Sequence, residues 1–293
     1  MSPITLLQCS DLHFGRDADL AQVAGLEALA TALSPSAVVV AGDLTQRARH
    51  GEFQRALDFV QAMRRISPTL VVPGNHDVEW WTTPFDVIGA AAKYEKYTRY
   101  FGTELTPTLV IDGAVLCGVL TSYGVAAGSM TYNLNDMAVK GHLPARETER
   151  AGTRFAEEPP EMLRIMVMHQ NLLRGRISQR MGLARWRAAW RQVMAAGTDL
   201  VLCGHDHEEA AGTLPNGAVV ATSSTHTSRT RGHRPSACNV ITADDESITV
   251  RHYIWEAALG LFQPGPEHAF ARPRVADPAA ARGWAASSPA LGP

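Results

Sequence analysis

Five short apolar runs in this chain are each followed at once by side chains that can bind metal ions. Each run is rich in Val, Ile or Leu, as expected for strands that are buried on both faces. The runs are residues 4–10, 37–41, 69–72, 163–168 and 200–203. Segments with helical spacing of apolar residues lie between them, at 18–33, 52–66 and 183–195. Strands that alternate with helices predict βαβ units and an α/β fold.

The metal-binding side chains follow the strands as five clusters. They are Asp11-Leu12-His13, Gly42-Asp43, Gly74-Asn75-His76-Asp77, His169 and Gly204-His205-Asp206-His207. In α/β sheets, functional groups collect on loops at the carboxyl ends of strands. We therefore expect these clusters, far apart in the sequence, to converge at one edge of the fold.

The donor types favour a pair of divalent transition metals. Four imidazoles, two carboxylates and one amide oxygen suit Mn, Fe, Zn, Co or Ni better than Ca or Mg, whose sites are dominated by oxygen. A pair of cations needs a bridging anion, and Asp43 is the predicted bridge. The predicted ligand sets are Asp11, His13, Asp43 and His207 for one ion, and Asp43, Asn75, His169 and His205 for the other. A positively charged centre of this kind suits an anionic phosphate ester.

Each cluster alone also has an ordinary structural interpretation. An Asp-x-His or Gly-Asp segment is common in turns, and a histidine that ends an apolar run is commonly a core residue. Only five of the eleven histidines fall in the clusters, so a general richness in histidine does not explain the pattern.

With these motifs in this order, the chain resembles the calcineurin-like metallophosphoesterase superfamily over roughly residues 4–255. The opening Ser10-Asp11-Leu12-His13-Phe14-Gly15 is similar to that of bacterial cyclic-nucleotide phosphodiesterases. Many of those relatives carry a second histidine after the one at His169, where this chain has Gln170.

The resemblance implies a fold and a reaction. The fold would be a double β-sheet sandwich flanked by helices, in four layers α/β/β/α. The reaction would be hydrolysis of a phosphodiester, such as a cyclic nucleotide, by metal-bound hydroxide. It also implies that Asp43 is part of the catalytic machinery and that His76 lies near the phosphate as a general acid or stabiliser.

Two other functions remain open at the level of sequence. Trp186 and Trp190 share a helix face with Arg187 and Arg191 beside it, and a basic helix that carries Trp can rest on a membrane. This would suit hydrolysis of a lipid-linked pyrophosphate or a phosphomonoester at the membrane surface, although packing against a sheet also explains the Trp face. The third alternative is a non-catalytic metal-binding scaffold.

Candidate substrate contacts are fewer. Trp80 and Trp81 follow the Asn75 cluster and would stack on a nucleobase or pack the loop. Arg174 would hold a second anionic group or lie in a solvated loop, and His226 would contact substrate or belong to an exposed polar loop.

Composition agrees with a soluble enzyme of 293 residues that buries a large core. The net charge of −2 gives no reason to expect binding of polymeric nucleic acid, and the four cysteines form no disulfide framework. No apolar run reaches the length of a membrane span, so we expect a cytoplasmic protein with at most peripheral membrane contact.

The pattern changes near the C-terminus. Two predicted hairpins, 210–214 with 218–223 and 237–243 with 248–253, are expected to complete the second sheet. From Pro264 onward Pro, Ala and Gly dominate, which predicts an irregular tail. The predicted organisation is a metallophosphoesterase domain at 1–255 and a Pro/Ala-rich extension at 256–293.

Overall fold

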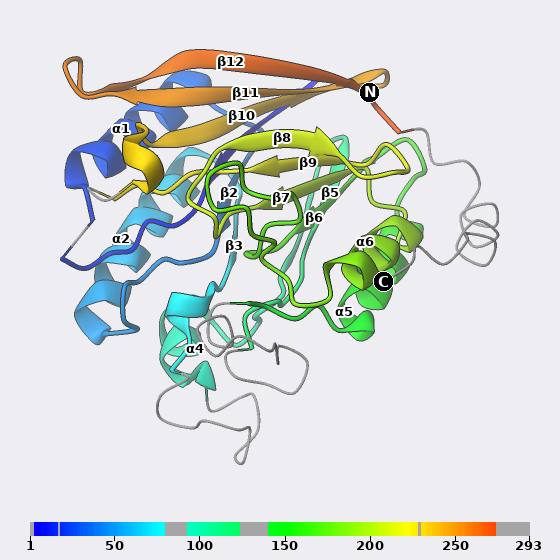
Figure 1. The fold of residues 1–293 in the computed structure, drawn as a ribbon, viewed down its shortest axis with the longest axis horizontal. Coiled ribbons are helices and arrows are strands. Elements are labelled where there is room, and N and C mark those ends of the chain that lie inside the picture. The colour runs from blue at the N-terminus through cyan, green and yellow to red at the C-terminus, as the bar shows by residue number, and fades with distance from the viewer. Residues whose placement is uncertain (1–2, 17, 80–92, 124–139, 228–229, 274–293) are drawn as a thin grey trace.

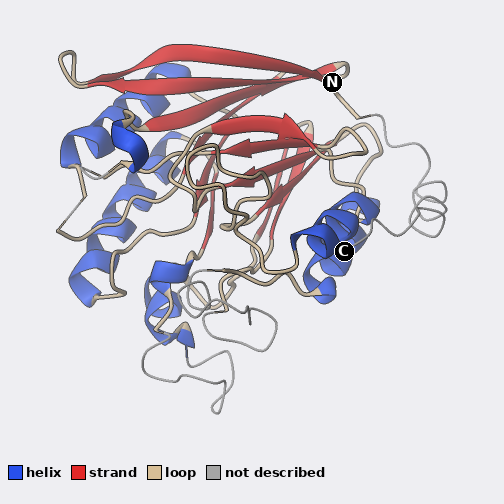
Figure 2. Ribbon diagram, viewed as in Figure 1, coloured by secondary structure: helices blue, strands red, loops and turns tan. Residues whose placement is uncertain are grey.

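The computed structural model describes residues 3–16, 18–79, 93–123, 140–227 and 230–273. Its described strands form two six-stranded sheets. Figure 1 shows the two sheets next to each other, with part of one sheet along the upper edge of the view. Figure 2 shows the helices on the outside of the sheets.

The first sheet combines a parallel half with an antiparallel half. Its strands are β1 (Ile4–Cys9), β2 (Ala37–Ala41), β3 (Thr69–Val72), β10 (Ala237–Ala243), β11 (Ser247–Glu256) and β12 (Leu261–Ala271). Their order is β12-β11-β10-β1-β2-β3. The pairs β1–β2 and β2–β3 are parallel, whereas β1–β10, β10–β11 and β11–β12 are antiparallel.

The second sheet has a parallel centre and an antiparallel strand at each edge. Its strands are β4 (Thr108–Ile111), β5 (Ala114–Gly118), β6 (Leu163–Val167), β7 (Leu200–Cys203), β8 (Ala210–Thr213) and β9 (Val219–Thr222). Their order is β4-β5-β6-β7-β9-β8. β5, β6, β7 and β9 run parallel, and β4 and β8 pair antiparallel at the edges.

Helices cover the outer face of each sheet. The helices α1 (Leu20–Leu33), α2 (His50–Ile66) and α4 (Glu95–Phe101) lie on the side of the first sheet, and α5 (Ala145–Ala156) and α6 (Trp186–Ala195) cover the second. The side chain of Asp19 caps α1 by accepting hydrogen bonds from the amides of Ala21 and Gln22.

Three apolar layers follow from the alternation of side chains along the strands. On β1, Leu7 faces the helices of the first sheet, whereas Leu6 faces the second sheet. The layer between the sheets also contains Val39, Ile165 and Leu202. The predicted four-layer α/β/β/α sandwich is therefore confirmed.

Two expectations about the C-terminal part are wrong. The first predicted hairpin, β8 with β9, does join the second sheet, but β10 and β11 join the first. β10 pairs with β1, with Ile4 opposite Ala243. A hairpin pattern identifies two strands but not the sheet edge that they occupy, and β1 offers an open edge on the side away from β2.

Residues 261–271 form a regular strand, β12, where an irregular tail was expected from Pro264. Phe262 packs into the core of the first sheet, and Gly25 of α1 allows a close approach of Trp255 and Phe262. Proline is tolerated here because β12 is the outermost described strand and needs hydrogen bonds on one side only. The residues after 273 lie outside the described part of the chain.

The Trp face of α6 packs inward. Trp186 and Trp190 lie against the core of the second sheet with their rings 4.8 Å apart, and Trp190 Nε1 donates to the carbonyl of Leu172 at 3.0 Å. Among the described helices, none combines the length and the apolar character needed to cross a bilayer.

Candidate metal centre

The ligand candidates converge where the carboxyl ends of strands from both sheets meet. Asp11 and Asp43 follow β1 and β2, and Asn75 lies in a short 3-10 helix (Asn75–Asp77) after β3. His169 follows β6 of the second sheet, and His205 and His207 follow β7. The site therefore lies across the seam between the two sheets.

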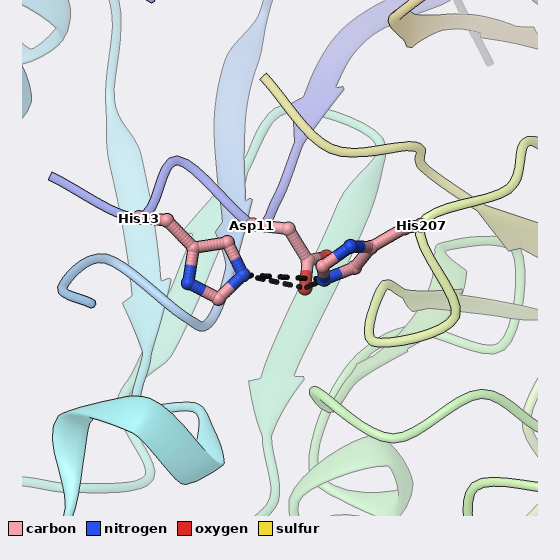
Figure 3. Close-up of side chains that lie close together, drawn as sticks. All are labelled: Asp11, His13 and His207. Atoms are coloured by element: carbon pink, nitrogen blue, oxygen red, sulfur yellow. Dashed lines mark hydrogen bonds and ion pairs between the residues drawn. The ribbon is translucent and has the colours of Figure 1, made fainter. Parts of the chain in front are cut away.

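Asp11, His13 and His207 form the first group (Figure 3). Asp11 Oδ1 lies 3.2 Å from Nε2 of His207 and 3.8 Å from Nε2 of His13. The two imidazole Nε2 atoms are 3.2 Å apart. Donor atoms of Asp11 and His13 thus face that of His207, which lies 194 positions after His13 in the sequence.

Asn75, His169 and His205 form the second group. Asn75 Oδ1 lies 3.0 Å from both Nε2 of His169 and Nδ1 of His205. The two imidazole nitrogens are 3.3 Å apart. The other ring nitrogen of His169 contacts the carbonyl of Ala41 at 2.9 Å, which directs Nε2 towards the group.

Asp43 lies between the two groups. Its Oδ2 atom is 3.2 Å from Nε2 of His169 and 3.7 Å from Nε2 of His13. Its Oδ1 atom accepts a hydrogen bond from the amide of His76 at 2.8 Å. One carboxylate thus faces both groups, as the predicted bridge requires.

Burial and charge together set the protonation of the site. Burial alone would raise the pKa of Asp11 and Asp43, but His207 beside Asp11 and His169 beside Asp43 hold both pKa values well below the ordinary range. Burial opposes a charge on His169, but Asp43 outweighs it and raises the His169 pKa to about 9. Two carboxylates are therefore ionised and ready to bind cations.

Two other histidines of the site behave differently, because burial outweighs their attraction to the carboxylates. Burial lowers the pKa of His13 to about 4 and that of His205 to about 3. Both imidazoles are therefore neutral near pH 7, which is the form that binds metal ions.

The loops that carry the predicted ligands are conformationally strained. Asp11, His13, Asp43, His205 and His207 all have positive φ, between 44° and 75°. This region is unfavourable for residues with a Cβ atom and costs on the order of 1–3 kcal/mol for each residue. Strain concentrated on five of seven predicted ligands indicates that the surrounding structure holds these side chains in place for a function.

Two glycines make the close approach of these loops possible. Gly42 has φ +83°, and a Cβ atom there would lie 2.6 Å from Nδ1 of His169. At Gly204 a Cβ atom would lie 2.3 Å from Ser10 Oγ and 2.5 Å from Asp11 Oδ2. Any side chain at either position would push predicted ligands from the two sheets apart.

His76 lies beside the first group. Its Nδ1 contacts the carbonyl of Gln46 at 2.8 Å, and its ring packs edge-on against His13 with centroids 4.7 Å apart. The carbonyl fixes the proton on Nδ1 and leaves Nε2 as the other reactive atom of the ring. His76, His13 and Asp43 also form a close group of donor atoms.

Several supporting residues were not predicted from the sequence. Asp77 accepts from the amides of Leu44, Thr45 and Gly74 at 2.8–3.1 Å and so joins the loops after β2 and β3. Ser10 Oγ and the amide of His205 both donate to Asp11 Oδ2, at 2.6 and 2.9 Å. The available signal was that Asp77 is a polar residue within one of the clusters and that Ser10 directly precedes another.

The loop 174–180 supports the ligand loop after β7. Amides of Arg176, Ile177 and Ser178 donate to the carboxylate of Glu208 at 2.9–3.0 Å, and Ser178 Oγ donates to Asp206 at 2.9 Å. Glu208 and Asp206 flank His207, so this loop limits its movement.

The outcome differs among the predicted substrate contacts. Trp80 and Trp81 lie outside the described residues. Arg174 is exposed, with Nη1 3.5 Å from the carbonyl of Gln179, and its contact with substrate stays a prediction. His226 is completely buried and contacts the carbonyl of Ser10 at 2.9 Å, so it presents no surface to a substrate.

The donor set fits two divalent cations. Asp11 Oδ1 is buried without a hydrogen-bond partner, and pairs of imidazole nitrogens face each other at 3.2 and 3.3 Å in the two groups. Nitrogen lone pairs converging on carboxylate and amide oxygens match the ligand preferences of transition metals.

The comparisons with known proteins agree with this site. Residues 4–209 match the calcineurin-like phosphoesterase family, so the chain belongs to that family. A search of curated protein sequences gives no match.

Solved structures show the same fold at low sequence identity. A purple acid phosphatase from seeds of yellow lupin (Lupinus luteus) has a TM-score of 0.64 and 13% identity over 92% of this chain and 54% of its own. A dimetal phosphatase from Danio rerio has a TM-score of 0.62 and 11% identity over 92% of this chain and 99% of its own. GAP50, described as the anchor in the inner membrane complex of Plasmodium, has a TM-score of 0.58 and 11% identity, covering 99% of each chain. This chain thus spans about half the length of the lupin protein, at 54%.

Proposed function

We propose that this chain is a binuclear metal-dependent phosphoesterase that hydrolyses a phosphodiester, for which a cyclic nucleotide is the leading candidate. The observation that carries the proposal is the position of Asp43 between two groups of nitrogen and oxygen donors. Membership of the calcineurin-like phosphoesterase family and the fold shared with a dimetal phosphatase support it.

The proposed ligands would hold two divalent cations across the seam between the sheets. Asp11, His13 and His207 would hold one, Asn75, His169 and His205 the other, and Asp43 would contact both. When bound, the cations supply positive charge for the phosphate oxygens and activate a water molecule for attack.

The chain itself supplies the proton chemistry through His76. Gln46 holds the Nδ1 proton of His76, so a second proton would reside on Nε2. From there it would pass to the oxygen that leaves when the P–O bond breaks. This step matters for esters whose leaving group is a strongly basic alkoxide, such as alkyl and cyclic diesters.

Partial packing of Trp186 and Trp190 of α6 against the core of the second sheet favours a structural role for this face over the alternative at the membrane surface. The non-catalytic scaffold predicts bound metals without turnover. A single experiment separates these alternatives from the proposal.

The protein is stripped with a chelator and reconstituted separately with Mn²⁺, Fe²⁺, Zn²⁺, Co²⁺ and Ni²⁺. Each form is assayed against p-nitrophenyl phosphate, bis(p-nitrophenyl) phosphate, cyclic mononucleotides and a lipid-linked pyrophosphate in detergent, with Asp43→Ala as the inactive control. The proposal predicts the highest kcat/KM for the diesters. Faster turnover of monoesters or of the pyrophosphate would contradict the substrate class, and metal binding without any turnover would support the scaffold.

A further inference from the structure

Three polar side chains on neighbouring strands form a row across the first sheet, next to the metal centre. Gln8 on β1 is opposite Asn239 on β10, which is opposite His252 on β11. All three are buried, with exposed fractions of 0%, 0% and 3%. We call these three residues the polar row.

The rows farther from the site are apolar. The next two rows on the same face are Leu6 with Ile241 and Val250, and Ile4 with Ala243 and Ile248. Three neighbouring strands thus change from apolar to polar side chains in the same row. This row is the last one on this face before the loops that carry the predicted ligands.

The donors and acceptors of the hydrogen bonds in the polar row can be assigned in one way. Gln8 Nε2 donates to the carbonyls of Cys203 and Ala221, at 2.8 and 3.3 Å. Its Oε1 accepts from Asn239 Nδ2 at 2.9 Å, and the same Nδ2 group donates to the carbonyl of Thr222 at 3.1 Å. Asn239 Oδ1 must then accept, so His252 Nδ1, at 2.7 Å, carries the proton that completes the chain.

The carbonyl groups that accept these hydrogen bonds belong to the second sheet. They lie at the carboxyl ends of β7 and β9, where the loops towards the metal centre begin. Cys203 is two residues before His205. Beyond Thr222, Ser224 Oγ donates to the carbonyl of His207 at 3.0 Å, and Thr225 Oγ1 donates to the carbonyl of Asp11 at 2.9 Å. The polar row therefore joins the two sheets within three residues of ligands on each.

We infer that the polar row sets the spacing between Asp11 and the ligands His205 and His207, and so tunes the metal affinity of the site. This rests on the proposed function, because it concerns the same two cations. Gln8, Asn239 and His252 are positioning residues in this account. Apolar side chains could fill the same space without the cost of burying a polar group that lacks a hydrogen-bond partner. They would, however, allow the two sheets to slide against each other. Directed hydrogen bonds fix one arrangement of the sheets.

The test uses His252, the member of the row farthest from the ligands along the hydrogen-bond chain. His252→Phe keeps a ring but loses the donor, whereas His252→Asn places an amide donor near the position of Nδ1. Val250→Ala, one row below on the same strand, is the control for general destabilisation by a cavity. Mn²⁺ affinity is measured by calorimetry on chelator-stripped protein, and thermal stability is measured in parallel without metal.

The expected result is a loss of Mn²⁺ affinity of about tenfold in His252→Phe, the range seen when supporting partners of metal ligands are removed, with near-native affinity in His252→Asn. Val250→Ala should lose stability and keep its affinity. Asn239→Leu, which removes the central link, should repeat the Phe result and serves if His252→Phe does not fold. Native Mn²⁺ affinity in folded His252→Phe or Asn239→Leu would overturn the inference while leaving the proposed function intact. Absence of Mn²⁺ binding by the unaltered protein would overturn both.

Discussion

The Oδ2 atom of Asp43 lies 3.2 Å from the Nε2 atom of His169, although the two residues follow strands of different sheets. The same oxygen lies 3.7 Å from His13. A carboxylate in this position controls how far apart two cations can sit, and its removal should affect both.

Asp43→Ala is therefore expected to lower metal content at both sites and to abolish phosphoesterase activity. The bridge sets the distance between the ions, typically ~3.5–4 Å in two-metal sites, and without it neither ion keeps its geometry. Metal content is measured by elemental analysis after gel filtration. Two tightly bound ions in the variant would remove Asp43 from the bridging role.

His169→Ala should lose mainly one ion, because Asp11, His13, Asp43 and His207 remain for the other. His13→Ala is the matched variant and should lose mainly the opposite ion. Titration of each variant with Mn²⁺ should show one tight site instead of two. Equal loss of both ions in either variant would mean that the division of ligands is wrong.

His76→Ala should keep both metals and lose activity selectively. A protonated imidazole near the leaving oxygen typically contributes ~10²- to 10⁴-fold. Alkyl and cyclic diesters need that proton, whereas p-nitrophenolate leaves readily without it. Comparison of kcat/KM on both types of ester, with metal content checked, provides the measurement. Equal losses would indicate that His76 only braces its loop through Gln46.

The chain truncated after Arg272 should keep its fold and its metal affinity. Arg272 closes the described structure by donating to the carbonyls of Glu161 at 2.8 Å and Asp244 at 3.3 Å. The same truncation with Arg272→Ala loses these bonds and should melt at a lower temperature. A loss of soluble protein after truncation at Arg272 alone would show that residues 273–293 contribute to the core.

The metal-free protein should lose stability as the pH falls below about 6.5, the ordinary pKa of histidine. Burial lowers the pKa of His13 and His226 to about 4 in the folded state. Between these values the unfolded chain binds more protons, so the stability present above pH 6.5 is lost as the pH falls towards 4. Thermal melts in a chelating buffer measure this slope. His226→Phe should make this slope shallower.

The sequence predicted where the candidate ligand clusters lie because their positions depend on local pattern. An apolar run that ends in Asp-x-His or Gly-Asp shows both the strand and the place where it stops, and Asp11, Asp43 and His169 lie where this pattern puts them. The choice of sheet for β10 depended on pairing between residues more than 230 positions apart, such as Ile4 and Ala243, which no local pattern contains.

Other features could not be predicted from the sequence, for similar reasons. β12 contains Pro264 and Pro266, which locally favour an irregular segment, and only the adjacent β11 and α1 make it a strand. The burial of His226 depends on Ser10 and Phe262, which are distant in sequence. Gln8 and Asn239 sit in otherwise apolar runs, and their partnership appears only once β1 and β10 are paired.

The position of β12 also bears on how the molecules behave at high concentration. Within the described part of the chain, β12 is an eleven-residue strand at the margin of the first sheet. A long, regular margin of this kind can act as a template on which a second molecule adds a strand. Pro264 and Pro266 lack backbone N–H groups and interrupt the row of donors, and the neighbouring Glu267 carries a charge. We therefore expect the same prolines that make the strand hard to predict from the sequence to limit aggregation through this margin.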